Sequence, residues 1–247
     1  MAVFELDQAQ LDAYIAYARP DAILAVHSRD RLLTLLSPEE RERHARFHFE
    51  RDRDIFLVAH ALVRRMLSRV IGTAPESLAF QAGEHGRPEL VAPDVARAFR
   101  FNLSHTRGLV ACAVARAADI GVDVETVERD VEILNVGNHV FSSIEVAGLA
   151  ALSGDAQRER FFELWTLKEA YIKAIGKGFS APLRSITFDP TRPDPVPVRF
   201  GPEVADDPAR WCLRRFDVGP SHRLALAFAA PLHARVMCEE AVAADLL

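Results

Sequence analysis

Two long stretches with helical periodicity, each closed by a glycine, constrain this sequence most strongly. The first spaces apolar residues from Phe56 to Val70 in the helical pattern and ends at Gly72, and the second covers residues 157–175 and ends at Gly176. Glycine suits the end of a helix because it adopts a left-handed backbone conformation without steric cost. Short strands follow each helix. The pattern predicts an α+β fold of two pseudo-symmetric halves, each a helix packed on a small antiparallel sheet.

The expected strands are short and either apolar or alternating in polarity. They cover residues 22–26, 78–80, 99–105, 109–115, 120–125, 185–188, 212–217 and 223–229. Residues 99–125 predict a β-meander, and residues 107–115 resemble residues 221–229, which is a weak sign of internal duplication. We expect the N-terminal half to cover residues 1–116 and the C-terminal half residues 117–247.

The amino-acid composition argues against several classes of protein. A net charge of −5 gives no general electrostatic footprint for nucleic acid. The three cysteines are scattered and form no CxxC pair, which favours a reducing compartment. The first residues include early acids and no signal-peptide pattern, and no apolar run approaches the roughly 20 residues of a membrane span. We expect a cytoplasmic protein with no membrane or nucleic-acid partner.

A base-rich segment follows a helix start. Ser37 is a candidate N-cap, Pro38 suits the first helical position, and Glu40 stands where a capping-box acid belongs. Residues 41–53 are then dense in arginine, whose planar fork matches phosphate oxygens. Taken alone, an arginine-rich helix is more often a solvated face.

Asp123 and Glu125 form the first acidic pair of interest. They lie two residues apart on a predicted strand, so both carboxylates share one face while Val122 and Val124 occupy the other. Two such carboxylates repel each other unless a cation lies between them, and a hard divalent ion is the usual solution. On spacing alone, a solvated strand face remains the commoner interpretation.

A second charged group lies on the helix of residues 157–175. Trp165, Lys168, Glu169 and Lys173 occupy neighbouring positions on a helix that is otherwise largely apolar. This pattern predicts a charged stripe at the edge of a cleft. The alternative is an ordinary surface pair of Glu169 and Lys173, which contributes a few tenths of a kcal/mol.

Together these segments resemble the ordered motifs of Sfp-type 4'-phosphopantetheinyl transferases. The resemblance covers roughly residues 22–230. The motifs are Gly-Arg-Pro at 86–88, Phe-Asn-Leu-Ser-His at 101–105, Gly-Val-Asp-Val-Glu at 121–125, and Trp-Thr-Leu-Lys-Glu-Ala-Tyr-Ile-Lys at 165–173 with Gly-Lys-Gly at 176–178. Each motif is weak by itself, but the set in this order is specific.

The resemblance implies a fold, a metal and a substrate. It implies the fold of that family, with coenzyme A held between the halves, and a Mg²⁺ ion, for which Mn²⁺ is a possible substitute. Asp123, Glu125 and Glu169 would be the metal ligands, and Lys168 and Lys173 would act catalytically near the pyrophosphate. The other implied contacts to coenzyme A come from Arg43, Arg53, Arg87, Pro88, Ser104 and His105.

Among those contacts, His105 and one or more bases of residues 41–53 would hold the 3'-phosphate, with Arg43 and Arg53 as candidates. Arg87 and Pro88 would lie against the nucleotide. Some members of the family carry lysine where this chain has Glu40, which leaves the N-terminal base in question.

The implied activity is transfer of the 4'-phosphopantetheine group of coenzyme A to a serine of an apo acyl or peptidyl carrier protein, which releases adenosine 3',5'-bisphosphate (EC 2.7.8.7 type). Either Glu169 or a metal-bound water would be the general base. A chain of this length supplies both halves itself, so we expect a monomer. Two other classes stay open from the residues: a metal-dependent phosphoesterase and a non-catalytic binding module.

Overall fold

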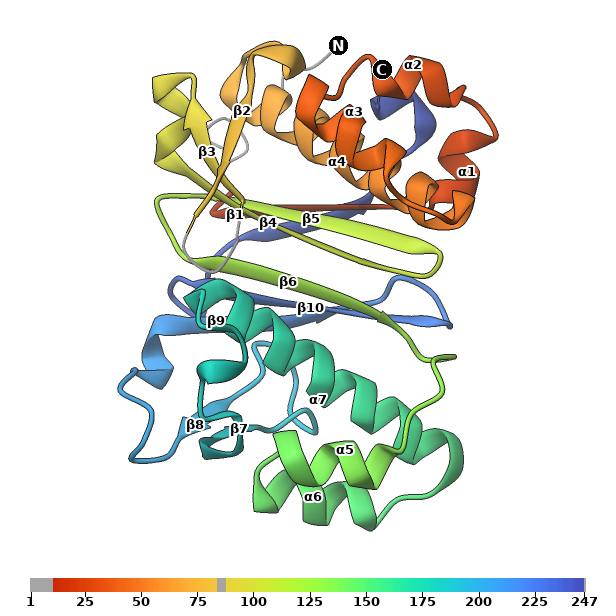
Figure 1. Cartoon of the computed structure of the whole chain (residues 1–247). Coiled ribbons are helices and arrows are strands. Elements are labelled where there is room, and N and C mark those ends of the chain that lie inside the picture. Colours follow the sequence, from red (N-terminus) through yellow and green to blue (C-terminus); the bar gives the residue numbers. More distant parts are fainter. Residues whose placement is uncertain (1–10, 84–87, 247) are drawn as a thin grey trace. The chain divides into compact units, whose positions relative to one another are not determined.

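The computed structural model describes residues 11–83 and 88–246, which form two units (Figure 1). Unit 1 comprises Met1–Ala118 and Arg235–Leu247, and unit 2 comprises Asp119–Ala234. The predicted assignment of all residues from 117 to the C-terminus to the second half is therefore wrong. Strand β11 (Val236–Glu240) pairs in parallel with β1 (Ala13–Ala18), which brings the end of the chain into unit 1.

Unit 1 contains a four-stranded sheet in the order β11-β1-β5-β4. Strands β4 (Phe99–Thr106) and β5 (Leu109–Arg116) form an antiparallel hairpin. A separate two-stranded ribbon pairs β2 (Ala79–Ala82) with β3 (Pro88–Ala92). The α-helices are α1 (Pro20–Leu24), α2 (Arg29–Leu33), α3 (Pro38–Ala45) and α4 (Glu50–Ile71).

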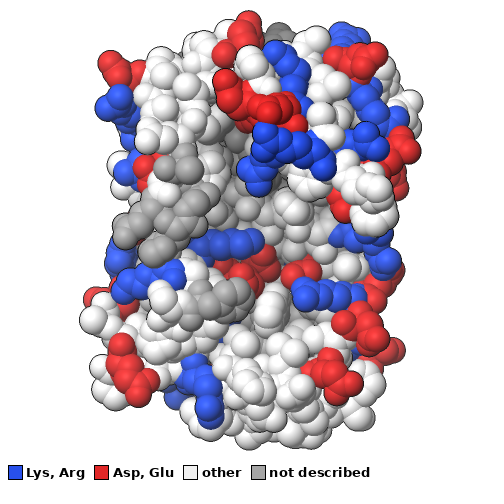
Figure 2. All heavy atoms as spheres, viewed as in Figure 1, with Lys and Arg blue, Asp and Glu red and all other residues white. Residues whose placement is uncertain are grey.

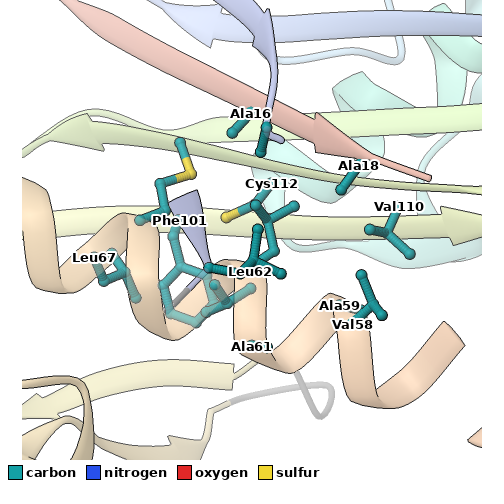
Figure 3. Packing of buried hydrophobic residues seen from close by; sticks show 14 of the residues in the cluster. Ala16, Ala18, Val58, Ala59, Ala61, Leu62, Leu67, Phe101, Val110 and Cys112 are labelled. Atoms are coloured by element: carbon teal, nitrogen blue, oxygen red, sulfur yellow. The ribbon is translucent and has the colours of Figure 1, made fainter. Parts of the chain in front are cut away.

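The core of unit 1 forms where α4 packs on the sheet. Figure 3 shows Leu62 and Ala59 of α4 directed toward Cys112 and Val110 of β5, with Phe101 of β4 beside them. All five side chains are buried, and burial of a large apolar side chain contributes roughly 1.5–3 kcal/mol. Helix α4 ends at Gly72, whose φ of 75° is left-handed, as the sequence predicts.

Unit 2 contains a three-stranded antiparallel sheet in the order β6-β10-β9, formed by Ile120–Thr126, His222–Ala229 and Trp211–Phe216. Helix α7 (Gly154–Ile175) packs on this sheet and ends at Gly176 (φ 69°), as predicted. Helices α5 (Ile133–Val140) and α6 (Ser143–Ala150) cover the other side of α7 (Figure 1). A short ribbon pairs β7 (Ile186–Phe188) with β8 (Val198–Phe200).

Two sequence predictions about strands are wrong. Residues 22–26 were expected to form a buried strand, but residues up to Leu24 belong to α1. Pro20 at its first position and Asp21 in its first turn favour a helix, and of the expected strand residues only Ile23 is fully buried, with Leu24 partly buried against the core. The predicted meander is also wrong at its last strand. Strand β6 pairs with β10 and not with β5.

The fold class itself is confirmed. Each unit is a long helix on a sheet, so the chain is α+β with two related halves, although the parallel pair of β1 and β11 makes the sheet of unit 1 mixed. In the described part of the chain, no helix has the length and apolar character needed to cross a membrane.

Candidate active site

Strand β6 presents Asp123 and Glu125 to α7, and Gly121 permits the close approach. A Cβ atom on Gly121 would lie 2.0 Å from the carbonyl oxygen of Ala170 and 2.5 Å from the amide nitrogen of Ala174, both in α7. Only glycine allows the two backbones to meet at this point. Asp123 and Glu125 share one strand face, as predicted from their spacing, and this is the face of Gly121, which lies against the helix.

Lys173 of α7 binds the first of these carboxylates. Its Nζ donates a hydrogen bond to Asp123 Oδ1 at 2.6 Å. The Asp123 side chain is only 6% exposed, while that of Lys173 is 28% exposed. The short contact and the burial identify a charge-assisted interaction at the edge of the helix–sheet interface.

Glu169 lies one helical turn before Lys173 and close to both acids of β6. The pKa of Glu169 is raised to about 7: burial is the main cause, the charges of Asp123 and Glu125 add to the rise, and Lys173 opposes it. This pattern arises when carboxylates crowd together around one positive charge. The structure therefore brings Asp123, Glu125, Glu169 and Lys173 together, as the sequence predicts.

The chemistry of these four charged groups suits a divalent cation. Oxygen donors with excess negative charge are what Mg²⁺ prefers, and the ammonium of Lys173 already binds Asp123 and acts electrostatically on Glu169. As placed, however, no three acidic, histidine or cysteine side chains among the described residues are close enough to hold a metal ion. Glu125 forms an ion pair with Arg129, and Asp123 forms one with Lys173, so these side chains would have to rotate to bind a metal ion.

Lys168 does not belong to this cluster, which corrects the prediction that it acts on the pyrophosphate. Its Nζ lies in the core of unit 2, 2.9 Å from Glu145 Oε2, and donates to the carbonyl oxygens of Leu183 and Ile186. The side chain is 1% exposed, and burial lowers its pKa while Glu145 opposes that change. It contacts α6 and β7 because its helix position faces away from the sheet.

In unit 1, Arg43 and Arg53 lie near Phe56. The guanidinium of Arg43 lies 5.5 Å from the ring centroid of Phe56. His44, which the sequence analysis missed, sits beside them: burial lowers its pKa, and the charge of Arg53 adds to that effect. His44 Nε2 and Arg53 Nε are buried and make no hydrogen bond. The position of His44 next to Arg43 in the sequence, on the side that faces α4, is the signal from which the residue could have been found.

The remaining predicted contacts are dispersed in unit 1. Ser104 is 5% exposed and His105 is exposed; the alternation of β4 places them on opposite faces of the sheet. Pro88 is exposed at the start of β3, and Arg87 lies outside the described residues. Glu40, which stands where some relatives carry lysine, is engaged inside unit 1, where its carboxylate accepts from Arg64 at 2.7 Å.

Comparison with known proteins identifies the family. Residues 26–117 match the model "4'-phosphopantetheinyl transferase, N-terminal", and residues 119–229 match "4'-phosphopantetheinyl transferase superfamily". The chain is 31% identical to 4'-phosphopantetheinyl transferase Sfp of Bacillus subtilis over 211 residues, which cover 85% of this chain and 90% of Sfp. This chain belongs to the Sfp-type 4'-phosphopantetheinyl transferases.

Other members of the family match shorter regions. HetI of Nostoc is 31% identical and covers 69% of this chain and 72% of its own length. The transferase gsp of Aneurinibacillus migulanus is 34% identical, with 62% of each chain covered. Among solved structures, holo-[acyl-carrier-protein] synthase of Thermotoga maritima covers 46% of this chain and 63% of its own at 18% identity and a TM-score of 0.37. The family reaction is 4'-phosphopantetheinyl transfer from coenzyme A to carrier proteins, and it is the activity of this transferase.

A cavity elsewhere in unit 2 of the transferase has no evident catalytic chemistry. It encloses about 730 Å³ beside the β9–β10 turn, and its charged lining is already paired. Arg215 binds Glu163 and Asp194, and Arg223 binds Glu159. Figure 2 shows acidic and basic side chains interspersed on the visible face, with no broad field of one sign. The converging acids of β6 and α7 remain the site with reactive character.

Proposed function

We propose that Asp123, Glu125 and Glu169 hold Mg²⁺ at the diphosphate of coenzyme A, with Mn²⁺ as a possible substitute. The observation that carries this proposal is the convergence of Asp123 and Glu125 of β6 on Glu169 of α7, with Lys173 bound to Asp123 beside them. The family generally uses Mg²⁺. When bound, the ion would neutralise charge that develops on the departing adenosine 3',5'-bisphosphate.

The protein residues supply the rest of the chemistry. The carrier serine hydroxyl attacks the phosphorus that bears the pantetheine arm, a new P–O bond forms, and the bond to the nucleotide's phosphate oxygen breaks. Glu169 accepts the serine proton, either directly or through a water molecule, because it is the carboxylate of α7 that faces the acids of β6. Lys173 stabilises the leaving phosphate as a point charge once it releases Asp123.

Unit 1 supplies the bases for the 3'-phosphate. We assign this role to Arg43, Arg53 and His105, and add His44, because buried Nε atoms of His44 and Arg53 make no hydrogen bond to protein. A phosphate dianion would supply the acceptor that these donors lack. Ser104, Arg87 and Pro88 remain proposed contacts to the nucleotide.

Two volume-preserving substitutions test the acidic cluster. Asp123→Asn and Glu169→Gln should each lower transfer at least about 100-fold, because each removes one charge needed in the transition state. The measurement is the mass added to an apo carrier protein incubated with Mg²⁺ and coenzyme A, with unchanged circular dichroism showing that the fold persists. Near-normal transfer by either variant would falsify the metal assignment.

Lys173→Ala separates catalysis from binding. We expect a large fall in kcat with little change in the affinity for coenzyme A, because the ammonium acts on the developing charge of the leaving group. A variant that lost only affinity would show that Lys173 is a binding residue. Arg192→Ala, an exposed base in unit 2, is the control for a change of net charge.

We further propose that the enzyme acts as a monomer in the cytoplasm. Its three cysteines are free, and Cys112 and Cys212 are buried, as expected for a protein of a reducing compartment. Sedimentation at assay concentration tests the monomer, and the mass-shift assay over a panel of apo carriers from fatty-acid, polyketide and peptide pathways identifies the acceptor.

A further inference from the structure

Arg129 lies in the turn that follows β6, and this turn is tightly fixed. The amide of Arg129 donates to the carbonyl oxygen of Thr126 at 3.3 Å, and the amide of Glu128 donates to Thr126 Oγ1 at 3.3 Å. Arg158 of α7 donates to the carbonyl oxygens of Val127 and Arg129. The backbone that carries the Arg129 side chain is thus tied to the same helix that carries Glu169.

From this position the guanidinium of Arg129 folds back onto the acidic cluster. Its Nη1 donates to Glu125 Oε1 at 3.2 Å. The Glu125 side chain is 15% exposed, whereas that of Arg129 is 55% exposed. Arg129 is therefore a solvent-facing counter-ion attached to one of the three carboxylates proposed to bind metal.

An arginine and a divalent cation compete for a carboxylate in two ways. Both need the lone pairs of the same oxygen, and both are positive, so each raises the free energy of the other at short range. Because Arg129 is half exposed, water screens its charge and the competition is modest in size. Lys173 acts similarly on Asp123, but Lys173 belongs to the proposed catalytic machinery and Arg129 does not.

We propose that Arg129 sets the metal affinity of the site by competing with the ion for Glu125. The proposal rests on the assignment of Glu125 as a metal ligand under the proposed function. An arginine in this position keeps the acids partly neutralised until a divalent cation displaces it, and the displaced guanidinium then faces solvent at the edge of the site.

The test is the affinity for Mn²⁺ alone, measured by electron paramagnetic resonance of the free ion. Arg129→Gln should bind Mn²⁺ about two- to fivefold more tightly than the wild type, the range expected from losing one partly exposed ion pair. Arg129→Lys should stay near the wild type because the charge remains. Arg210→Gln is the control: the Arg210 side chain is similarly exposed, at 48%, and its partners Asp119 and Asp206 lie outside the cluster, so affinity should not change.

A double-mutant cycle separates this inference from the function beneath it. In a Glu125→Gln background, Arg129→Gln should no longer change Mn²⁺ affinity. Unchanged or weaker binding by Arg129→Gln in the native background overturns the inference while leaving the metal site intact. If the wild type binds no Mn²⁺, or Glu125→Gln binds it normally, the metal assignment itself fails and the inference fails with it.

Discussion

In each unit, an equivalent buried ion pair between a base and a glutamate holds the long helix in place. Helices α4 and α7 are both 22 residues long, and Arg64 and Lys168 lie at the same position in them, counted from the glycine that ends each helix. Arg64 Nε lies 2.7 Å from Glu40, and Lys168 Nζ lies 2.9 Å from Glu145. The agreement supports the internal duplication that the sequence only suggested.

The acids of these pairs also correspond. Glu40 completes a capping box with Ser37 at the start of α3, and Glu145 completes one with Ser142 at the start of α6. Each carboxylate therefore caps a short helix and neutralises a base on the long helix that follows. The arrangement locks the short helix against the long one.

The bases correspond in their remaining contacts as well. Arg64 Nη1 donates to the carbonyl oxygens of Pro75 and Leu78, and Lys168 Nζ donates to those of Leu183 and Ile186. Both pairs of carbonyls flank a short 3₁₀ helix, Pro75–Ser77 in unit 1 and Leu183–Ser185 in unit 2, and a two-stranded ribbon follows each.

The difference lies where each long helix meets its sheet. In unit 1 that interface is apolar, with Leu62 of α4 against Cys112 of β5. In unit 2 it carries Glu169 and Lys173 on α7 and Asp123 on β6. A repeated scaffold thus carries, in unit 2, the charges that we propose to be catalytic, and Lys168 belongs to the scaffold.

Removing the buried bases should have the largest effect on stability. Lys168→Met should cost about 3–5 kcal/mol of unfolding free energy, because Glu145, only 2% exposed, is left as an uncompensated buried charge. Arg64→Met should cost less, since Glu40 is 14% exposed and retains His60 at 3.0 Å. Urea unfolding of the two variants measures both values.

A second substitution checks the cause of that loss. Replacing Glu145 as well, in Lys168→Met/Glu145→Gln, should recover part of the stability, because no buried charge remains and the glutamine oxygen can still accept a hydrogen bond from the amide of Ser142 or Phe188. If the Lys168→Met protein were as stable as the wild type, Lys168 would not have the structural role of Arg64. It would then again be a candidate contact to the substrate.

Gly121→Ala should have an intermediate effect that is specific to unit 2. Its new Cβ would collide with the backbone of α7, so we expect a loss of about 3 kcal/mol and weaker metal binding as β6 moves from the helix. Gly148→Ala in α6, where a Cβ meets nothing within 4 Å, is the control and should be neutral or stabilising. Equal effects at the two glycines would refute the close approach as the cause.

Glu40→Gln should have the smallest effect and one that depends on pH. Burial raises the pKa of Glu40, but hydrogen bonds from His60 and Arg64 outweigh it and lower the pKa to about 2. A depressed pKa stabilises the fold above the ordinary value of 4.5, and this contribution disappears as pH falls toward 2.

Glutamine at position 40 can still form the capping box, so the Glu40→Gln variant measures the effect of the charge alone. The wild type should exceed Glu40→Gln by about 2 kcal/mol at pH 7, after allowance for solvent screening, and the gap should close between about pH 4.5 and 2. Thermal unfolding across that range measures it. A gap that stayed constant with pH would contradict the charge-based explanation.

Much of the site follows from local sequence patterns. The spacing of Asp123 and Glu125, the glycine ends of both long helices and the capping box at Ser37 are set by residues close in sequence, and all four features are present in the structure. The strand at residues 22–26 failed because five apolar or small residues fit a short helix as well as a strand.

The sequence by itself determined the α+β class and the shared face of Asp123 and Glu125, because periodicity fixes which side chains share a face. The resemblance of its ordered motifs to a known family indicated the family and added Glu169 to the set of acids. Only the tertiary structure decided the direction of Lys168. Lys168 and Glu169 are adjacent in the sequence, yet the 100° step of the helix turns Lys168 toward the core and Glu169 toward β6. Which side of α7 is buried depends on α6 and the sheet, and those partners are distant in sequence. The acidic pair of β6 is likewise more than a solvated strand face, because Gly121 lets that face lie against the helix.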